Sequence, residues 1–329
     1  MIVVQSASRL HFGLLSFPSG SHWPNHRGEE SIPARRFGGV GLMVQSPGIS
    51  LQFRDAKEWS ANGPLADRAL AFAHRFADTL ERKGSPQEIT IKQCAPEHIG
   101  LGTGTQLGLA VARGLSMAWD RHFQPQELCH RVDRGARSAL GFYGFLHGGI
   151  LVEAGKSSHS EIAPLLVREP FPGEWRVLLV IPAEPAGLSG MKEAQAIEEL
   201  LAHGIPLNHT ETMCRLVLLG ILPALKENDL KSFGESLSDL NYLAGQVFAK
   251  IQGGAYRPRV AQIIQFIQRQ GISGVGQSSW GPAVFTVIED TPRARDLSEK
   301  IRKTFNLNEK EVLVTSACNH GATANVIAE

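Results

Sequence analysis

The chain has 329 residues, a formal net charge of +1, and 43% hydrophobic and 20% charged residues. This length and balance predict a globular protein with a sizeable core and two domains. The near-neutral charge argues against broad binding to nucleic acid or to a membrane surface. No segment approaches the roughly 20 apolar residues that span a bilayer. Neither a nucleic acid nor a membrane is therefore expected as a partner.

The cysteines indicate the compartment more than the chemistry. Cys94, Cys129, Cys214 and Cys318 are widely spaced and form no CxxC pair, so a zinc site or a redox pair is not expected. Scattered cysteines suit a reducing environment. The first residues, Met-Ile-Val-Val-Gln-Ser, lack the basic stretch and long apolar run of a signal peptide. The sequence therefore predicts a cytoplasmic protein.

The first half of the chain is rich in strand patterns, with a few helices. Apolar residues alternate with polar ones at 49–53, which is the period of a half-buried strand. The polar segment 18–33 holds glycine and proline and is expected to be a long loop. The expected strands are 2–4, 9–15, 49–53, 88–94 and 148–153. The expected helices are 65–83, about 104–118 and 125–140.

The second half follows a proline-rich linker at 170–173. A continuous apolar strand is expected at 176–181 and further strands at 283–288 and 312–315. The expected helices are 192–202, 210–226, 229–250, 257–270 and 294–305. A second glycine-rich run occupies 271–281. Because strands and helices do not alternate steadily along the whole chain, the pattern favours an α+β fold over a parallel doubly wound sheet.

The segment 95–106, Ala-Pro-Glu-His-Ile-Gly-Leu-Gly-Thr-Gly-Thr-Gln, joins an expected strand to an expected helix. Glycine lets main-chain N–H groups approach a ligand, and a helix start supplies free N–H donors with a partial positive charge. The segment therefore predicts a cradle for phosphate or diphosphate. The alternative is a tight turn that only packs the strand on the helix. The candidate phosphate-binding residues are Gly100, Gly102, Thr103, Gly104, Thr105 and Gln106.

Neither glycine-rich run matches a standard nucleotide-binding fingerprint. Three separated motifs together resemble the layout of the GHMP kinase superfamily: Ser-Arg-Leu-His-Phe-Gly at 8–13, the segment 96–106, and 274–279. The resemblance covers most of the chain. It implies an α+β fold with a ribosomal-protein-S5-domain-2-like N-terminal domain at 1–168 and a ferredoxin-like C-terminal domain at 174–329. Gly104 stands where the superfamily commonly has a serine that helps hold magnesium and the ATP phosphates, which argues against ordinary kinase activity.

A narrower resemblance accounts for that departure. The form Gly-Leu-Gly-Thr-Gly-Thr-Gln at 100–106 is similar to the β-ribofuranosylaminobenzene 5′-phosphate synthases, a non-kinase branch of the superfamily. So are Arg-Phe-Gly-Gly-Val-Gly-Leu at 36–42, Arg-Gly-Ala-Arg-Ser-Ala-Leu-Gly at 134–141 and Phe-Leu-His-Gly-Gly at 145–149. The resemblance implies decarboxylating phosphoribosyl transfer from phosphoribosyl diphosphate to 4-aminobenzoate or 4-hydroxybenzoate, early in tetrahydromethanopterin synthesis. It also implies a divalent cation, usually Mg²⁺.

This reaction needs anion binders, a cation on the diphosphate and a flat pocket that holds the ring against C1 of the ribose, but no strong protein nucleophile. Arginines can contact a phosphate or the benzoate carboxylate, although each is otherwise a solvated surface cation. Ser138 can donate to phosphate or cap a turn. The second glycine-rich run is expected to close over the donor. The further candidates are Arg36, Arg137, Gly276, Gln277 and Ser278, with Arg35 and Arg134 as weaker ones.

Two histidines are catalytic candidates. His11 or His147 could assist the departure of diphosphate as an acid or orient the ring substituent, whereas a single strand histidine is usually structural. Phe142 and Phe145 could wall the aromatic pocket, although clustered aromatic residues are more often plain core. The metal-binding carboxylates are not identified; Glu97 and Glu153 are candidates.

Two other functions stay open from the sequence. One is an ATP-dependent small-molecule kinase of the GHMP type. The other is a ligand-binding or assembly protein on the same fold, without turnover. The sequence does not choose between the two benzoates, and the superfamily resemblance is compatible with a homodimer.

Overall fold

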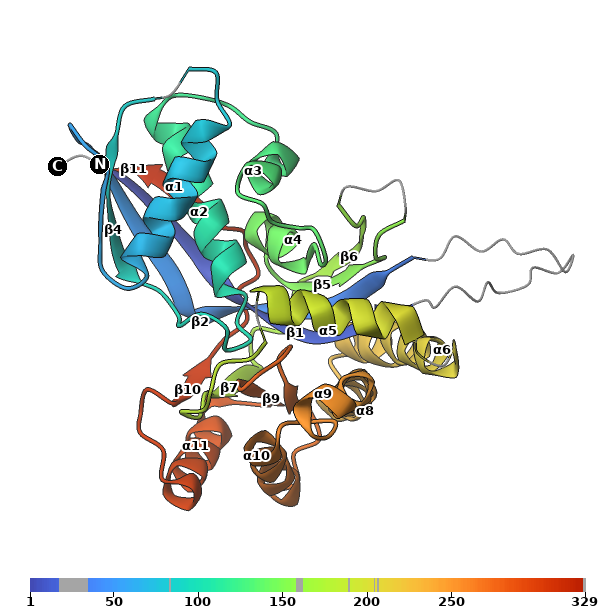
Figure 1. The fold of residues 1–329 in the computed structure, drawn as a ribbon. Coiled ribbons are helices and arrows are strands. Elements are labelled where there is room, and N and C mark those ends of the chain that lie inside the picture. Colours follow the sequence, from blue (N-terminus) through green and yellow to red (C-terminus); the bar gives the residue numbers. More distant parts are fainter. Residues whose placement is uncertain are drawn as a thin grey trace, which may run out of the picture.

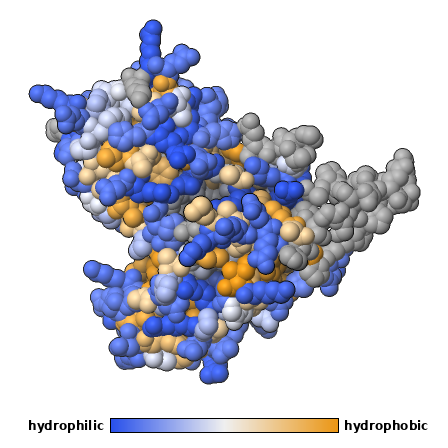
Figure 2. Space-filling model, viewed as in Figure 1, coloured by the Kyte–Doolittle hydropathy of each residue, from blue (hydrophilic) through white to orange (hydrophobic). Residues whose placement is uncertain are grey.

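The computed structural model describes residues 1–17, 35–82, 84–157, 162–188, 190–203, 205 and 207–327. The loop expected at 18–33 lies outside the described residues. The chain forms two bodies, each a sheet covered by helices, one above the other in Figure 1. Hydrophilic side chains cover most of the face shown in Figure 2. Among the described residues, no helix combines the length and the hydropathy that a membrane crossing needs.

In the described part of the chain, the first body is built on a seven-stranded sheet with the order β11-β1-β2-β4-β3, extended beyond β2 by β5 and β6. All its strand pairs are antiparallel except the parallel pair of β3 and β4. The strands are β1 Ile2–Ser16, β2 Phe37–Asp55, β3 Ser60–Asn62, β4 Gln87–Gln93, β5 Ile150–Glu153, β6 Leu165–Glu169 and β11 Thr323–Val326. The strands expected at 2–4 and 9–15 are one strand, β1, whose register on β2 shifts after Ser6 and again after His11.

Helices cover one face of this sheet, and α2 runs closest to the strands (Figure 1). A Cβ at Gly114 would lie 2.2 Å from the Phe53 ring, so glycine is required where α2 approaches β2. Buried Leu107, Val111 and Leu115 of α2 join the core beneath. The helices are α1 Ala66–Asp78, α2 Thr103–Ala118, α3 Pro125–Arg131 and α4 Leu140–His147.

The single helix expected at 125–140 is wrong. The structure has two helices there, α3 and α4, joined by the non-helical segment 132–139. Asp133 and Gly135 take positive φ angles of 54° and 80°, which end the right-handed helix. The arginines and the serine expected near this helix therefore lie on a loop.

The second body has, among the described residues, a four-stranded antiparallel sheet with the order β10-β7-β9-β8. Helices α8 and α10 lie between β7 and β8 in the chain, and α11 lies between β9 and β10, which is the expected ferredoxin-like arrangement. The strands are β7 Arg176–Val180, β8 Val275–Gln277, β9 Val284–Ile288 and β10 Val312–Thr315. The helices are α8 Leu230–Val247, α10 Pro258–Arg269 and α11 Thr291–Phe305.

The remaining helices of the described chain are α5 Gly190–His203, α6 Leu207–Leu216, the π-helix Val217–Ile221, α7 Leu222–Glu227 and α9 Ala249–Gln252. Helix α8 packs against β1 as well as β8, and one core cluster joins the two bodies. In that cluster the rings of Phe12 in β1 and Phe285 in β9 lie 4.9 Å apart. The second half of β1 is therefore shared by both bodies.

The last strand returns to the first body. Residues 323–326 of β11 pair with residues 2–5 of β1. The segment expected to be a C-terminal domain, 174–329, thus contributes one strand to the N-terminal sheet, because the edge of β1 is free to pair there. Elsewhere the division into 1–168 and 174–329 stays a prediction.

Candidate active site

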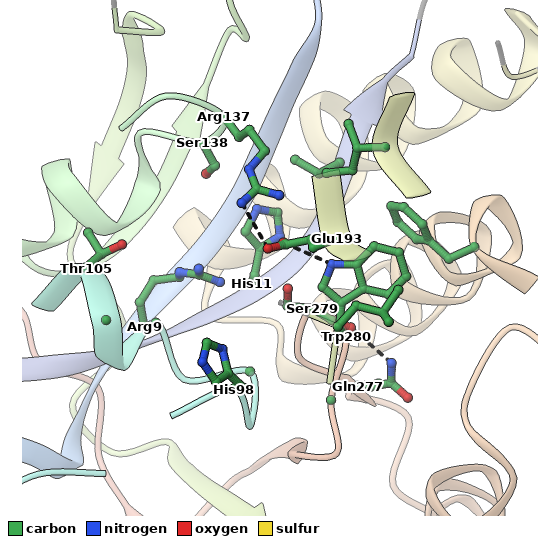
Figure 3. A pocket seen from close by; sticks show the side chains of 18 of the residues that line it. Arg9, His11, His98, Thr105, Arg137, Ser138, Glu193, Gln277, Ser279 and Trp280 are labelled. Carbon is green, nitrogen blue, oxygen red and sulfur yellow. Dashed lines mark hydrogen bonds and ion pairs between the residues drawn. The ribbon is translucent and has the colours of Figure 1, made fainter. Parts of the chain in front are cut away.

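A cavity of about 460 Å³ lies where β1, the glycine loop, the segment 132–139 and α5 meet the second glycine-rich run. Figure 3 shows side chains from both bodies around it. The cavity thus lies at the junction that β1 creates, with both glycine-rich runs in its wall. The predicted site residues that line it are His11, Gly100, Gly102, Thr103, Gly104, Thr105, Arg137, Ser138 and Gln277.

The glycine loop ends in the first turn of α2. Gly102 is the N-cap residue, with φ +68°, and its carbonyl accepts the N–H groups of Thr105 and Gln106, both at 3.1 Å. Within the described part of the chain, the N–H groups of Thr103 and Gly104 make no main-chain hydrogen bond. These main-chain donors are available to an anion at the cavity wall.

Arg9 lies over this loop. Its own N–H donates to the Leu101 carbonyl at 2.9 Å, and a Cβ at Gly102 would lie 3.1 Å from the Arg9 Cβ and 3.2 Å from its Nε. Its Nε and Nη1 are buried and have no hydrogen-bond partner in the structure. Burial lowers the pKa of Arg9 to about 10, against the opposing effect of Glu153 and Glu193. Two nitrogens of the buried Arg9 guanidinium therefore lack an acceptor, which is costly unless a ligand supplies one.

Arg9 was not a candidate from the sequence. The signal that could have found it is the strand period of two, which places Arg9 on the same face as the candidate His11.

A second group of cations lies beside the loop. The guanidinium carbons of Arg68 and Arg134 lie 5.1 and 5.0 Å from the centre of the Phe72 ring. Arg68 Nε pairs with Glu97 Oε1 at 3.3 Å, whereas the buried Nε of Arg134 has no partner. Burial, with the nearby Arg68 as the second cause, lowers the pKa of Arg134. The weaker candidate Arg134 is thus a cavity residue.

Glu193 of α5 links the two bodies across the cavity (Figure 3). Arg137 Nη2 donates to Glu193 Oε2 at 2.9 Å, and Trp280 Nε1 donates to Glu193 Oε1 at 3.1 Å. Glu193 was not a candidate from the sequence, and Trp280 was included only as a member of the second glycine-rich run. A glutamate in the first turn of an amphipathic helix has the ordinary pattern of a solvated residue, so the sequence gives no signal for it.

The second glycine-rich run connects the motifs more than it offers phosphate ligands. Fully buried Ser278 donates from Oγ to the Gly100 carbonyl at 2.7 Å and accepts the His11 N–H at 2.9 Å. Ser279 N–H donates to the His11 carbonyl at 3.2 Å. Ser278 does not line the cavity. Neither does Gly276, whose added Cβ would lie 2.3 Å from the Asn241 Oδ1.

Gln277 lines the cavity, but its side chain is already bonded. Its Nε2 donates to Gln252 Oε1 and to the Ser279 carbonyl, and its Oε1 accepts the Arg257 N–H.

Other candidates lie away from the cavity. His147 is exposed at the end of α4, where its ring stacks 6.4 Å from that of Tyr143. Arg36 is exposed and its main chain bridges to Lys156, while Arg35 Nη1 donates to the Gly155 carbonyl. His147 and Arg36 belong to the motifs that carry the resemblance, but neither they nor Arg35 line the cavity.

Three candidates are part of the core instead. Phe142 and Phe145 are 1% and 6% exposed and belong to the core under α1 and α2, because α4 turns this face toward the sheet. Gln106 is fully buried and donates from Nε2 to the Gly141 carbonyl at 2.7 Å, so it ties α2 to α4. Thr103 lines the cavity, but its hydroxyl donates to the Pro96 carbonyl at 2.9 Å.

His11 lines the cavity but is buried. Burial, and then the nearby Arg9 charge, hold the pKa of His11 well below its usual value. The imidazole is therefore neutral at physiological pH and is a poor proton donor. It can orient a ligand through a hydrogen bond, which is the second of the two roles predicted for it, and burial disfavours the first, that of an acid.

Glu153 holds the segment 132–139 from behind the cavity. Its Oε1 accepts from Ser138 Oγ at 2.6 Å and its Oε2 from the Ala139 N–H at 2.6 Å. It is 1% exposed, and burial raises its pKa to about 7 even though both hydrogen bonds and Arg9 act in the opposite direction.

Two family models match the chain: the GHMP kinases N terminal domain over residues 68–149 and the GHMP kinases C terminal model over residues 221–307. The beta-ribofuranosylphenol 5'-phosphate synthase of Methanothermobacter thermautotrophicus is 30% identical over 315 residues, which cover 88% of this chain and 90% of that protein. Its namesake from Archaeoglobus fulgidus is 28% identical over 340 residues, covering 99% and 100%. Homoserine kinase from Cytophaga hutchinsonii matches with a TM-score of 0.66 at 16% identity over 99% of this chain and 97% of that chain, which shows a shared fold.

Replacing Glu153 by Gln should change how stability depends on pH. A carboxyl whose pKa is raised from 4.5 to about 7 on folding contributes stability below pH 4.5 that is lost as the pH rises through 7. Once the carboxyl is fully ionised, the free energy of unfolding has fallen by on the order of 3 kcal/mol on this account. Urea unfolding of both proteins at pH 5, 6 and 7.5 measures it: the free energy of unfolding of the parent should fall relative to Glu153→Gln. Parallel pH profiles would contradict the assignment.

Ser278→Ala should loosen the join between the motifs. It leaves the buried Gly100 carbonyl and His11 N–H without their Ser278 partner, so the free energy of unfolding should fall by about 2 kcal/mol. Denaturant titration measures the change, with Ser60→Ala on the exposed strand β3 as the matched control. A loss no larger than that of the control would show that Ser278 does not connect the motifs.

Proposed function

The chain belongs to the beta-ribofuranosylphenol 5'-phosphate synthase family, within the GHMP kinase fold, and we propose that it is a pentosyltransferase that condenses phosphoribosyl diphosphate with 4-hydroxybenzoate. The bond from C1 of the ribose to diphosphate breaks, and C1 gains positive charge. The ring carbon that bears the carboxylate attacks C1, and a C–C bond forms. The carboxylate leaves as carbon dioxide, and the electron pair of its bond restores the aromatic ring.

One observation carries this proposal: the buried Arg9 guanidinium has unpartnered Nε and Nη1 beside the free amides of the glycine loop. Two carboxylates of the cavity wall form ion pairs with other arginines: Glu97 through Oε1 with Arg68, and Glu193 through Oε2 with Arg137. Arg9 and Arg134 are left with buried N–H groups for a ligand. A donor that carries a 5′-phosphate and a diphosphate supplies the missing anions.

The name of the relatives favours 4-hydroxybenzoate as the acceptor, because their named product is a phenol. An amine para to the carboxylate pushes electrons into the ring as a hydroxyl does, so 4-aminobenzoate is the second acceptor to test. We further propose that the product serves the synthesis of tetrahydromethanopterin. The four free cysteines favour a cytoplasmic location.

The residues present fit Mg²⁺ bound chiefly through the donor. Mg²⁺ commonly takes one or two carboxylates and completes its shell with substrate phosphates and water. Among the described residues, no three His, Cys, Asp or Glu side chains gather as a metal site. Both oxygens of Glu153 are bonded to the protein, so Glu97, at the cavity wall, would hold the ion. Bound there with diphosphate, Mg²⁺ would neutralise charge on the leaving group.

The chain's own residues bind and orient. The loop amides and Arg9 fix the donor phosphates, Arg134 adds a second cation, and neutral His11 is placed to hydrogen-bond a hydroxyl. Because these groups are set by the fold before the ligand arrives, they need no reorganisation as charge moves to the diphosphate.

Purified full-length protein with phosphoribosyl diphosphate, carboxyl-labelled 4-hydroxybenzoate and Mg²⁺ should release diphosphate and labelled carbon dioxide in equal amounts. Chelation by EDTA should stop both, and added Mg²⁺ should restore them. Diphosphate release without carbon dioxide, or no release with either benzoate, would overturn the proposal. ATP-dependent phosphorylation of a small alcohol would instead identify a kinase.

Thr105→Val tests the donor end. A Cβ at Gly141 would lie 3.0 Å from Thr105 Cγ2, so the methyl group faces α4, and Figure 3 shows the hydroxyl on the cavity side. Losing a hydroxyl contact to phosphate costs about 1–3 kcal/mol, which is roughly 5- to 150-fold in the KM for phosphoribosyl diphosphate. Steady-state kinetics measure it, with Thr323→Val on exposed β11 as the control. An unchanged donor KM would remove Thr105 from the donor site.

A further inference from the structure

The cavity has two unlike sides. The arginines and the glycine loop form the first side, described above. The opposite side is formed by the end of α8, by α5, by the segment after β8 and by Leu14 of β1. Polar side chains line these segments too, and the apolar and aromatic ones include Leu14, Ile197, Ala244, Phe248 and Trp280. A ligand with charged and flat aromatic parts fits such a division.

Trp280 and Phe248 form a fixed pair on this side. Their ring centroids lie 4.5 Å apart with an interplanar angle of 59°, and both residues are half-buried. Phe17, 1% exposed, holds Phe248 from behind through an edge contact with centroids 5.6 Å apart. The Trp280 indole N–H is held by Glu193. Two rings fixed in this way form a wall against which another ring can pack at little cost in side-chain entropy.

Arg137 lies next to this wall because Glu193 bonds both. One carboxylate takes the indole N–H on Oε1 and Arg137 Nη2 on Oε2. Arg137 Nη1 is buried and has no partner in the structure. Glu193 therefore fixes the position of this unpartnered cationic N–H relative to the aromatic wall. An aromatic acid presents the matching features, a flat ring and a carboxylate.

We propose that Trp280 and Phe248 bind the ring of the aromatic acid acceptor, that Arg137 binds its carboxylate, and that Glu193 is the positioning residue that holds Trp280 and Arg137 together. This rests on the function proposed above and assigns the acceptor to a part of the cavity. The donor phosphates then occupy the side of Arg9 and Arg134. The acceptor ring reaches C1 from the α5 side, and Phe142 and Phe145 take no part.

The test separates the ring from the carboxylate by using phenol, which has the ring alone, as an inhibitor. Trp280→Leu should raise the KM for 4-hydroxybenzoate and the Ki for phenol by at least roughly tenfold. Arg137→Gln should raise the KM for 4-hydroxybenzoate but leave the Ki for phenol unchanged. Glu193→Gln keeps an oxygen for the indole N–H but loses the ion pair with Arg137. It should therefore also raise the KM for 4-hydroxybenzoate and leave the Ki for phenol unchanged.

Three controls guard the interpretation. The KM for phosphoribosyl diphosphate should stay within twofold in Trp280→Leu and Glu193→Gln. Trp280→Phe, which keeps a ring at this position, should give an acceptor KM between those of the parent and of Trp280→Leu. Trp59→Leu removes a tryptophan that packs on Trp119 and does not line the cavity, and it should change neither constant.

A raised donor KM with an unchanged acceptor KM in Trp280→Leu would overturn the proposal and place the donor at this wall. Absence of product with the parent protein would overturn the proposed function instead. Calorimetry of 4-hydroxybenzoate with Mg²⁺ and diphosphate then tests the wall directly. Binding that Trp280→Leu weakens supports the wall, and binding of equal affinity refutes it.

Discussion

The cavity depends on the hydrogen bonds that join three segments far apart in the chain. Ser278 bonds the Gly100 carbonyl and the His11 N–H, and the Arg9 N–H bonds the Leu101 carbonyl. These contacts bring together β1, the start of α2 and the segment after β8, which come from both bodies of the fold. Breaking any of these buried hydrogen bonds would leave a donor or acceptor without a partner, which costs free energy. The network therefore fixes the relative position of the motifs. The groups that face the ligand are set by it.

The electrostatics of the site follow from that arrangement. Bringing β1 against the glycine loop buries the Arg9 guanidinium beside free helix amides, where an unpaired cation is unfavourable. The nearby carboxylates relieve it only in part, because Glu153 is bonded to Ser138 and Ala139, and Glu193 to Arg137 and Trp280. The cavity lining thus holds more arginines than carboxylates, and a polyanionic donor would balance this excess of positive charge. Burying these arginines costs free energy of folding, and binding of an anionic donor offsets part of that cost.

Local chemistry could be predicted from the sequence, and long-range placement could not. Glycines and hydroxyls between a strand and a helix indicated the loop at 100–105 and the start of α2, because those features depend on neighbouring residues. Phe142 and Phe145 were misplaced because the period of α4 does not say which face meets the sheet. Trp280 and Glu193 come from segments 87 residues apart, and only the fold brings them together. The break of the helix expected at 125–140 depends on Asp133 at positive φ, which residue type alone does not dictate.

Gly104, where the superfamily commonly has a serine, has a structural reading. A Cβ at this position would lie 3.5 Å from Glu97 Oε1 and 3.7 Å from Arg134 Nη2, so a larger side chain would point between these two groups. Glycine leaves both open to the cavity: the carboxylate for the proposed cation and the guanidinium for a phosphate. At the position where the superfamily resemblance implies a serine, the start of α2 thus leaves room for Glu97 and Arg134 at the cavity wall. Glycine at position 104 therefore changes which side chains a ligand meets at the start of α2, while the main-chain donors of α2 stay in place.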